Sequence, residues 1–344
     1  MYKRQHLPQA AHLELGSPID QIRAAGDVVV LPLANQLGKH TDLGQAAARL
    51  AAINLPVIGI GLGAQAGSPD MDVQITEGTR AWLQVISKLR PDDGPNIGVR
   101  GAYTLEQLGK LGFPDLGVVV GCPSNFINLE ADIATAVEVG FARPPRRIAV
   151  AAGIPYIPSL AHIERDLADV VTLTGGAYIV QHGLEMLQLA RREFAKMGEG
   201  KLEAAHNYIM PNRTTAEFCS WCERYAYAHY DARSWMDFLR RFDFVVGTRF
   251  HGIMLAIQAG VPGACIAHDS RTIEMCETMG IPVRHYSEID GEITQHNVRD
   301  YFHFDSAAYT EKRHKLLDAY VSLLTRADMP LTTSLRVPPR SAAS

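Results

Sequence analysis

The chain has 344 residues, of which 47% are hydrophobic and 20% are charged, and its formal net charge is -4. This length exceeds the roughly 250 to 300 residues at which a single core usually stops growing, so we expect two globular domains. Nucleic-acid binding is not expected, because a phosphate backbone requires a basic face and the sequence has no extended cluster of lysines or arginines.

Apolar runs alternate with amphipathic helical patterns in the first part of the chain. Strands are predicted at residues 27–33, 56–60, 96–99 and 118–120, and helices at residues 43–53, 76–89 and 102–111. The run at residues 27–33 has no polar alternation, which is typical of a strand buried on both faces. This alternation of strands and helices predicts a doubly wound parallel sheet, and so a Rossmann-like N-terminal domain.

The periodicity is interrupted near residues 140–147 and then resumes. Strands are predicted at residues 147–152, 178–181, 244–246, 263–267 and 283–286, and helices at residues 159–170, 184–197, 214–241, 253–259, 273–279 and 309–324. We place the domain boundary between residues 142 and 143 and predict a second Rossmann-like domain over residues 143–330. The Ser-, Pro- and Ala-rich segment at residues 331–344 is predicted to be a disordered tail.

Cysteine usage and hydropathy indicate the compartment. Cys219 and Cys222 form a CxxC pair, but no second pair or histidine pair follows at zinc-ligand spacing, so we interpret them as packing residues. Five sparse cysteines fit a reducing compartment. No apolar run approaches the roughly 18 residues of a membrane span, and the N-terminus has no apolar signal-peptide segment. We therefore predict a cytoplasmic protein, for which peripheral membrane contact stays open.

The glycine-rich turn after residues 56–60 resembles a dinucleotide-binding fingerprint only in part. Gly61, Gly63 and Ala66 satisfy GxGxxA, but residues 67–70 do not begin a helix and no acidic residue ends a strand about 20 residues later. We interpret the turn as a place where the backbone approaches a ligand, with Gln65 as a polar contact. P-loop, HExxH, GxSxG and EF-hand motifs are also absent from the sequence.

The strongest functional signal lies in residues 243–282, where two predicted strands end in polar turns. Arg249 and His251 follow the first strand at a glycine turn, immediately before a predicted helix. Arginine can hold a carboxylate or phosphate through two parallel hydrogen bonds, histidine titrates near neutral pH, and a helix N-terminus offers free N–H groups. The alternative is that Arg249 pairs structurally and His251 is a satisfied polar residue at the helix start.

The second strand of this stretch, residues 263–267, ends in a turn that contains His268, Asp269 and Arg271. Because the carboxyl ends of parallel strands meet at one edge of a sheet, we expect these side chains near Arg249. An aspartate before serine and threonine is also an ordinary helix cap, so both interpretations of Asp269 stay open. We expect an anion to bind at this edge of the sheet.

The order and spacing of these motifs resemble the polysaccharide pyruvyl transferase family. The resemblance runs over about residues 25–290, and its segments are GLGAQA at 61–66, GVRGAYT at 98–104, GCPS at 121–124, VGTRFHG at 246–252, AGVP at 259–262 and HDSRT at 268–272. It implies two Rossmann-like domains facing a cleft, as in the GT-B arrangement. It also implies transfer of a pyruvyl group from phosphoenolpyruvate to a sugar as a ketal, in polysaccharide or exopolysaccharide biosynthesis.

The implied chemistry assigns roles to residues of the second domain. Phosphoenolpyruvate carries a carboxylate and a phosphate, for which Arg249, Arg271 and the helix that begins near Gly252 are candidate clamps. His251 is assigned either protonation of the enol carbon or a role on the leaving phosphate. The scheme requires no metal and no cofactor, since phosphoenolpyruvate is the donor substrate.

The first domain is expected to hold the acceptor sugar or glycan. Asn35, Asp42 and Gln65 follow predicted strands there, and Arg100 and Ser124 are further binding candidates. Surface pairing is the alternative for Arg100, and helix capping is the alternative for Asp42.

One departure from the family and two other functions stay open. The family usually begins with an extra strand and a glycine-containing turn before the strand matched here by residues 27–33, so we expect a first domain shortened at its start. The first rival function is a nucleotide-sugar glycosyltransferase of GT-B type. The second is a non-catalytic protein that binds glycans or anions.

Overall fold

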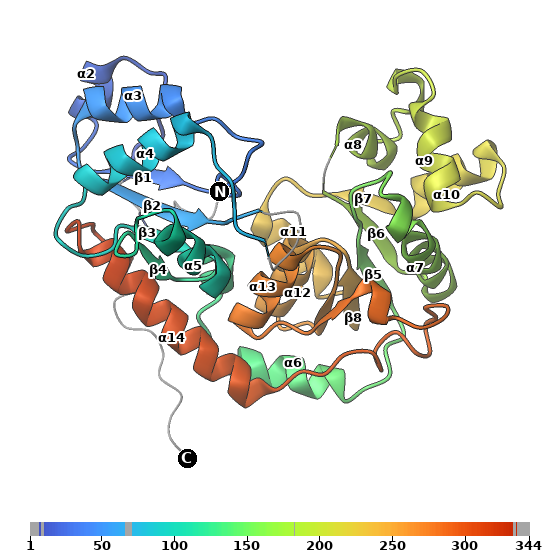
Figure 1. The fold of residues 1–344 in the computed structure, drawn as a ribbon. Helices are drawn as coiled ribbons and strands as arrows, with labels where there is room; N and C mark the ends of the chain where they lie inside the picture. Colours follow the sequence, from blue (N-terminus) through green and yellow to red (C-terminus); the bar gives the residue numbers. More distant parts are fainter. Residues whose placement is uncertain (1–6, 8–9, 66–70, 182, 333–334, 336–344) are drawn as a thin grey trace. The chain divides into compact units, whose positions relative to one another are not determined.

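The computed structural model describes residues 7, 10–65, 71–181, 183–332 and 335 (Figure 1). The chain divides into two compact units, one formed by Met1–Leu129 with Glu311–Ser344 and the other by Glu130–Thr310. Both units are built on a parallel sheet, which confirms the predicted α/β class. The division at residue 129 corrects the predicted boundary at residue 142, and the C-terminal segment joins the first unit instead of the second.

In the first unit, the chain adds each described strand on the same side of the previous one, so the strand order follows the sequence. The strands are β1 (Val29–Pro32), β2 (Val57–Leu62), β3 (Ile97–Val99) and β4 (Gly117–Val119), paired in the order β1-β2-β3-β4. The helices between them are α3 (Gly44–Ile53), α4 (Glu77–Lys88) and α5 (Ala102–Lys110), and α2 (Ile19–Ala24) precedes β1. The described strands of this unit contain no reversal of order, so the predicted double winding does not apply to them.

The core of the first unit follows from the two-residue alternation of its strands. Ile97 and Val99 of β3 point to the face that packs on α3, α4 and α5, where they share a core with Trp82 and Leu108. The intervening Gly98 faces the other way. Right-handed crossovers that all run in one direction place their helices on one face of the sheet, so the opposite face needs another cover.

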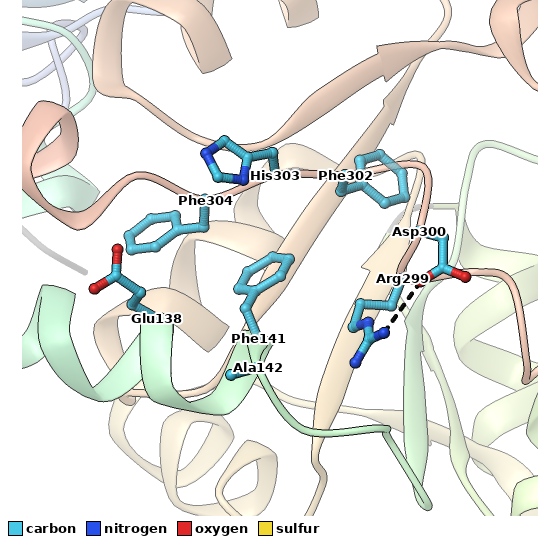
Figure 2. Close-up of a pocket in the computed structure, with 8 residues that line it drawn as sticks. All are labelled: Glu138, Phe141, Ala142, Arg299, Asp300, Phe302, His303 and Phe304. Carbon is cyan, nitrogen blue, oxygen red and sulfur yellow. Dashed lines mark hydrogen bonds and ion pairs between the residues drawn. The ribbon is translucent and has the colours of Figure 1, made fainter.

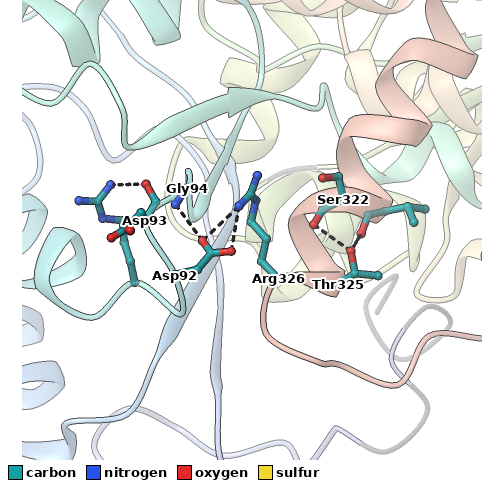
Figure 3. Close-up of polar contacts among 8 residues, drawn as sticks. Asp92, Asp93, Gly94, Ser322, Thr325 and Arg326 are labelled. Carbon is teal, nitrogen blue, oxygen red and sulfur yellow. Dashed lines mark hydrogen bonds and ion pairs between the residues drawn. The ribbon is translucent and has the colours of Figure 1, made fainter.

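Helix α14 (Ser306–Thr325) supplies this cover. A Cβ at Gly98 would lie 2.9 Å from the Leu323 side chain, and the Tyr320 ring stacks on Phe126 with centroids 5.3 Å apart. Beyond the helix end, Arg326 Nη1 donates to both carboxylate oxygens of Asp92 at 2.9 and 3.1 Å (Figure 3). Residues 311–325 of α14 therefore belong to the first unit, because they bury the face that the crossovers leave uncovered, whereas residues 306–310 belong to the second unit.

The described strands of the second unit form a six-stranded parallel sheet, and the direction in which the chain adds strands reverses once within it. They are β5 (Ile148–Ala151), β6 (Ala177–Val180), β7 (Ala226–Ala228), β8 (Phe244–Gly247), β9 (Gly263–Ala267) and β10 (Val283–His285). Their order is β10-β9-β8-β5-β6-β7, which is the Rossmann order 3-2-1-4-5-6 read from β7. The chain leaves β5 toward one edge of the sheet and later returns to build β8 on the other side, so the switch point lies between β5 and β8.

Besides the start of α14, the described residues of the second unit form eight α-helices. They are α6 (Ile133–Phe141), α7 (Ala161–Thr174), α8 (Leu184–Ala190), α9 (Lys201–Ile209), α10 (Thr215–Tyr225), α11 (Ala232–Leu239), α12 (Phe250–Gln258) and α13 (Ser270–Met279). The helical segment predicted at residues 214–241 is interrupted by β7, a three-residue strand that pairs with β6. Asp231 then starts α11 by accepting hydrogen bonds from the backbone N–H groups of Arg233 and Ser234.

The unit boundary lies before α6 because the end of that helix packs on the second sheet. Phe141 contacts Phe244 edge to face at 5.4 Å between centroids and stacks on Phe304 at 5.8 Å. A sequence break at residues 140–147 is real, but it connects α6 to β5 within one unit.

Three further expectations meet the structure. The strand predicted at residues 27–33 is β1, but it is not buried on both faces. Its first three residues are half-buried and Pro32 is exposed, and among the described residues β2 is the strand that pairs with it. Most of the predicted tail at residues 331–344 lies outside the described residues, although Leu331 and Leu335 are described and buried. No helix in the described part of the chain has the length and apolar character needed to cross a bilayer.

Candidate functional site

The switch point of the second sheet is formed by a close approach of β5 and β8. A Cβ at Gly247 would lie 2.2 Å from the carbonyl oxygen of Ala151, its partner in the strand register, and Gly247 has a φ of +152°. Glycine is therefore required where β8 ends. The chain then turns outward and places Thr248 and Arg249 beyond the carboxyl ends of the strands, where open α/β sheets bind ligands.

A buried carboxylate lies beneath this turn. Glu164 of α7 is 1% exposed and accepts hydrogen bonds from the Gly153 N–H (2.9 Å), the Thr248 hydroxyl (3.1 Å) and the Tyr178 hydroxyl (2.7 Å). Burial raises the pKa of Glu164, and the three hydrogen bonds and the charge of Arg249 oppose this rise. This acid was not predicted as a site residue, although its spacing from Leu167 places it on the apolar face of the helix, where an acidic side chain is unusual.

At the carboxyl edge of the second sheet, Arg249 has more buried nitrogen atoms without a hydrogen-bond partner among the described residues than His268 or Arg271. It immediately precedes α12, and its Nε and Nη2 atoms are shielded and have no hydrogen-bond partner among the described residues. Burial lowers the pKa of Arg249, as does the nearby charge of Arg271, whereas Glu164 and Asp269 act in the opposite direction. Nε and Nη2 form the parallel pair of donors that fits two oxygens of a carboxylate or phosphate, so an anion would satisfy both.

The turn after β9 brings a second guanidinium to the same edge. Asp269 caps α13 by accepting the Thr272 N–H at 2.8 Å, and its other oxygen lies 3.2 Å from Arg271 Nη2 and 3.8 Å from His268 Nε2. Burial opposes ionisation of Asp269, but Arg271, Thr272 and His268 together hold its pKa below the usual value. Burial lowers the pKa of His268. The capping interpretation of Asp269 is thus realised, and the same carboxylate also orients Arg271.

His251 lies in the first turn of α12, two residues after Arg249. Its side chain is exposed, and its ring meets Phe250 edge to face at 5.4 Å between centroids. The structure therefore gathers Arg249, His268, Asp269 and Arg271 into one electrostatic cluster and leaves the imidazole of His251 at the surface of the same helix start.

In the first unit, three predicted residues lie at the carboxyl edge of its sheet. Arg100 follows β3 and donates from Nη1 to Asn35 Oδ1 at 2.7 Å, across the loop that follows β1. Gln65 follows β2, is exposed, and its N–H donates to the Leu37 carbonyl at 2.8 Å. Of the GxGxxA pattern, Ala66 lies outside the described residues, as do residues 67–70.

Two other predicted residues of this unit are engaged structurally. Asp42 accepts the Gly44 N–H at 2.9 Å, and this bond, followed by the Thr76 hydroxyl, lowers the pKa of its carboxyl. The capping alternative thus accounts for Asp42. Ser124 is fully buried, and its hydroxyl donates to Cys122 Sγ at 3.0 Å, which favours a packing role over ligand contact.

A cavity of about 450 Å³ lies elsewhere in the second unit, between α6 and residues 299–304 (Figure 2). Phe141 lines it and contacts Phe244, the first residue of β8, so the cavity is at the amino edge of the sheet and Arg249 is at the other. Its arginine, Arg299, is paired with Asp300 at 3.2 Å. The described residues contain no group of three His, Cys, Asp or Glu side chains placed to hold a metal ion.

No curated protein sequence matches the chain. Among solved structures, it is similar to a candidate UDP-N-acetylglucosamine 2-epimerase from Listeria monocytogenes, with 15% identity over 91% of this chain and 72% of the other and a TM-score of 0.42. It is also similar to the protein in the S. aureus MnaA–UDP co-structure, with 11% identity over 93% and 77% of the two chains and a TM-score of 0.42.

The family comparison covers most of the chain. The family described as Polysaccharide pyruvyl transferase matches residues 25–270, a segment that contains the carboxyl edge of the first sheet and, at the second edge, Arg249, His251, His268 and Asp269, and that ends one residue before Arg271. The protein therefore belongs to the polysaccharide pyruvyl transferase family.

Proposed function

We propose that this protein transfers a pyruvyl group from phosphoenolpyruvate to a sugar of a polysaccharide or glycan precursor and forms a ketal there. The observation that carries this proposal is that Nε and Nη2 of Arg249, at the switch point of a Rossmann sheet, have no hydrogen-bond partner among the described residues. Two oxygens of a planar carboxylate or of a tetrahedral phosphate can accept from these two donors, and phosphoenolpyruvate carries one group of each kind.

Two anionic groups require a second positive pole close to the first. Arg271 supplies it from the next strand end, where Asp269 orients its guanidinium, and the first N–H groups of α12 add a partial positive charge. Placing both poles on adjacent strands of one rigid sheet fixes their separation before the ligand arrives. This preorganisation favours a small dianion over a single charged group.

The transfer forms two carbon–oxygen bonds and breaks one. Two sugar hydroxyls attach to C2 of the donor, the C2–O bond to phosphate breaks, and C3 gains one proton and becomes a methyl group. Two hydroxyl protons are released, which balances the proton taken up by C3 and the one that leaves with phosphate. The exposed imidazole of His251 is assigned the proton transfer to C3 or to the leaving phosphate.

The acceptor sugar is assigned to the carboxyl edge of the first sheet. Arg100 and Asn35 form a hydrogen-bonded pair there, and the Gln65 side chain is exposed beside them. Asp42 and Ser124 are weaker acceptor contacts in this assignment, because capping and burial already engage them. No metal and no cofactor is needed, and the reaction is placed in the cytoplasm, where phosphoenolpyruvate is made.

The test is phosphate release from phosphoenolpyruvate with galactosyl, glucosyl and mannosyl acceptors, with the ketal methyl group followed by NMR. Arg249→Ala and His251→Ala should each lower the rate by about 100-fold. Arg240→Ala, which removes an exposed arginine paired with Asp237, serves as the matched control and should keep the rate.

Three results would count against the proposal. Near-normal turnover in both the Arg249 and His251 variants would remove the assigned roles. Thermal stabilisation by a nucleoside diphosphate but not by phosphoenolpyruvate would favour a nucleotide-sugar glycosyltransferase. Binding of phosphoenolpyruvate without phosphate release across the acceptor panel would favour a non-catalytic binding protein.

A further inference from the structure

Glu164 connects the elements that form the switch point. Its carboxylate accepts one hydrogen bond after β5, from Gly153, one from Tyr178 of β6, and one after β8, from Thr248. A Cβ at Gly153 would lie 2.3 Å from Thr248 Oγ1 and 2.4 Å from Glu164 Oε1, so these groups contact one another with no room for a side chain between them. Thr248 immediately precedes Arg249, and the carboxylate therefore fixes the turn that carries the guanidinium.

The carboxylate also compensates the charge of Arg249 without using its hydrogen-bond donors. The two side chains attract each other electrostatically, and the hydrogen bonds that Glu164 accepts come from Gly153, Tyr178 and Thr248. Nε and Nη2 of Arg249 have no partner among the described residues. A direct ion pair with Glu164 would occupy Nε and Nη2 of Arg249. Because the carboxylate instead contacts Thr248, the residue before Arg249, it stabilises the guanidinium charge and leaves both donors available to an anion.

We propose that Glu164 is a positioning residue of the anion site, and that binding of a dianion to Arg249 is coupled to protonation of the Glu164 carboxyl. An anion bound to Arg249 neutralises the guanidinium charge that had stabilised the Glu164 carboxylate. The anion also repels the carboxylate, so its binding favours the neutral, protonated form of Glu164. The inference rests on the proposed function only in taking phosphoenolpyruvate as the natural anion.

The groups around Glu164 show which charge can affect its protonation. Among the described residues, the titratable groups that face it are Tyr178 from β6, Tyr208 from α9 and Arg249 from the turn before α12. Burial raises the pKa of both tyrosines, so they stay neutral in the pH range of interest. Arg249 is thus the charged partner of Glu164 among the described residues, and a change at Arg249 acts on the carboxyl directly.

The experiment measures sulfate binding to the full chain by titration calorimetry from about pH 5.5 to about pH 8.5, a range in which sulfate stays a dianion. The affinity of the wild-type protein should fall as pH rises, by up to about tenfold per pH unit where one proton is taken up on binding. Glu164→Gln keeps the shape of the side chain. Its amide oxygen can still accept from Gly153 and Thr248, while its NH2 group donates to the Tyr178 hydroxyl and reverses the direction of that bond. The variant should flatten this dependence and bind sulfate about tenfold more tightly than wild type at the high-pH end.

Two further variants separate the charge of Glu164 from other effects. His268 also loses charge as pH rises, so His268→Gln should keep the part of the pH dependence that Glu164→Gln removes. Thr248→Val retains the carboxylate but removes the hydroxyl that ties the turn to it, and should weaken sulfate binding about tenfold at about pH 5.5, where the coupling leaves least charge on Glu164.

An equal pH slope in wild type and Glu164→Gln would overturn the coupling, and unchanged binding in Thr248→Val would overturn the positioning role. If Glu164→Gln does not fold, which circular dichroism detects, the Thr248→Val arm and the comparison of wild type with His268→Gln still decide. Because sulfate cannot donate a pyruvyl group, these outcomes are independent of whether phosphoenolpyruvate is consumed.

Discussion

Replacing Gly247 with alanine tests whether the approach of β5 and β8 builds the switch point. The added methyl group would lie 2.2 Å from the carbonyl oxygen and 2.8 Å from the carbonyl carbon of Ala151. These are backbone atoms of the paired strand, so relief requires the two strands to separate. The backbone conformation costs about 1 to 3 kcal/mol for a residue other than glycine, and overpacking costs about 1 to 3 kcal/mol. We therefore expect a loss of about 2 to 6 kcal/mol in the free energy of unfolding.

The assay is urea unfolding followed by tryptophan fluorescence, to which Trp221 and Trp235 of the second unit contribute. Gly260→Ala is the matched control, because Gly260 has a φ of +76° but its nearest contact to an added methyl is 3.8 Å away. It should lose only about 1 kcal/mol, the cost of the backbone conformation. A loss in Gly247→Ala no greater than in Gly260→Ala would refute the steric argument.

Three more predictions concern the anion site and the C-terminal helix. Arg249→Lys keeps the charge but not the two parallel donors, so the Kd for phosphoenolpyruvate measured by calorimetry should rise at least about tenfold. Burial raises the folded-state pKa of Glu164, so unfolding titrations should show wild-type stability falling as pH rises above about 4.5, a decline absent from Glu164→Gln. Tyr320→Ala should cost about 3 to 5 kcal/mol in denaturant unfolding, because this ring is fully buried on Phe126, whereas Arg326→Ala removes an exposed ion pair and should leave stability nearly unchanged.

Each of these has a contradicting outcome. Equal affinity in Arg249→Lys would show that the paired donors are not used. Parallel stability curves for wild type and Glu164→Gln would show that the carboxyl titrates normally. A loss in Tyr320→Ala as small as that in Arg326→Ala would mean that α14 does not cover the first sheet.

Local patterns were sufficient where a residue's role is set by its immediate neighbours. The strand predicted at residues 263–267 coincides with β9, and the helix predicted at residues 76–89 is α4, for which Thr76 is the N-cap. Asp269 is likewise recognisable as a cap from the serine and threonine that follow it. The missed strand β7 shows the converse, because three residues between two helices become a strand only when β6 offers an edge to pair with.

Strand ends that carry Arg249 and Arg271 were visible in the sequence by themselves, since apolar runs that end in glycine and charge mark the carboxyl edge of a parallel sheet. The family resemblance was visible there too, and the family match confirms it. What only the tertiary structure decided is the order of the strands, and with it the residues that meet from distant parts of the chain. Glu164 becomes a neighbour of Thr248 only because β8 returns to pair with β5, and α14 joins the first unit only because a one-way sheet leaves a face uncovered. Both depend on pairing and burial between segments far apart in sequence, which no local pattern encodes.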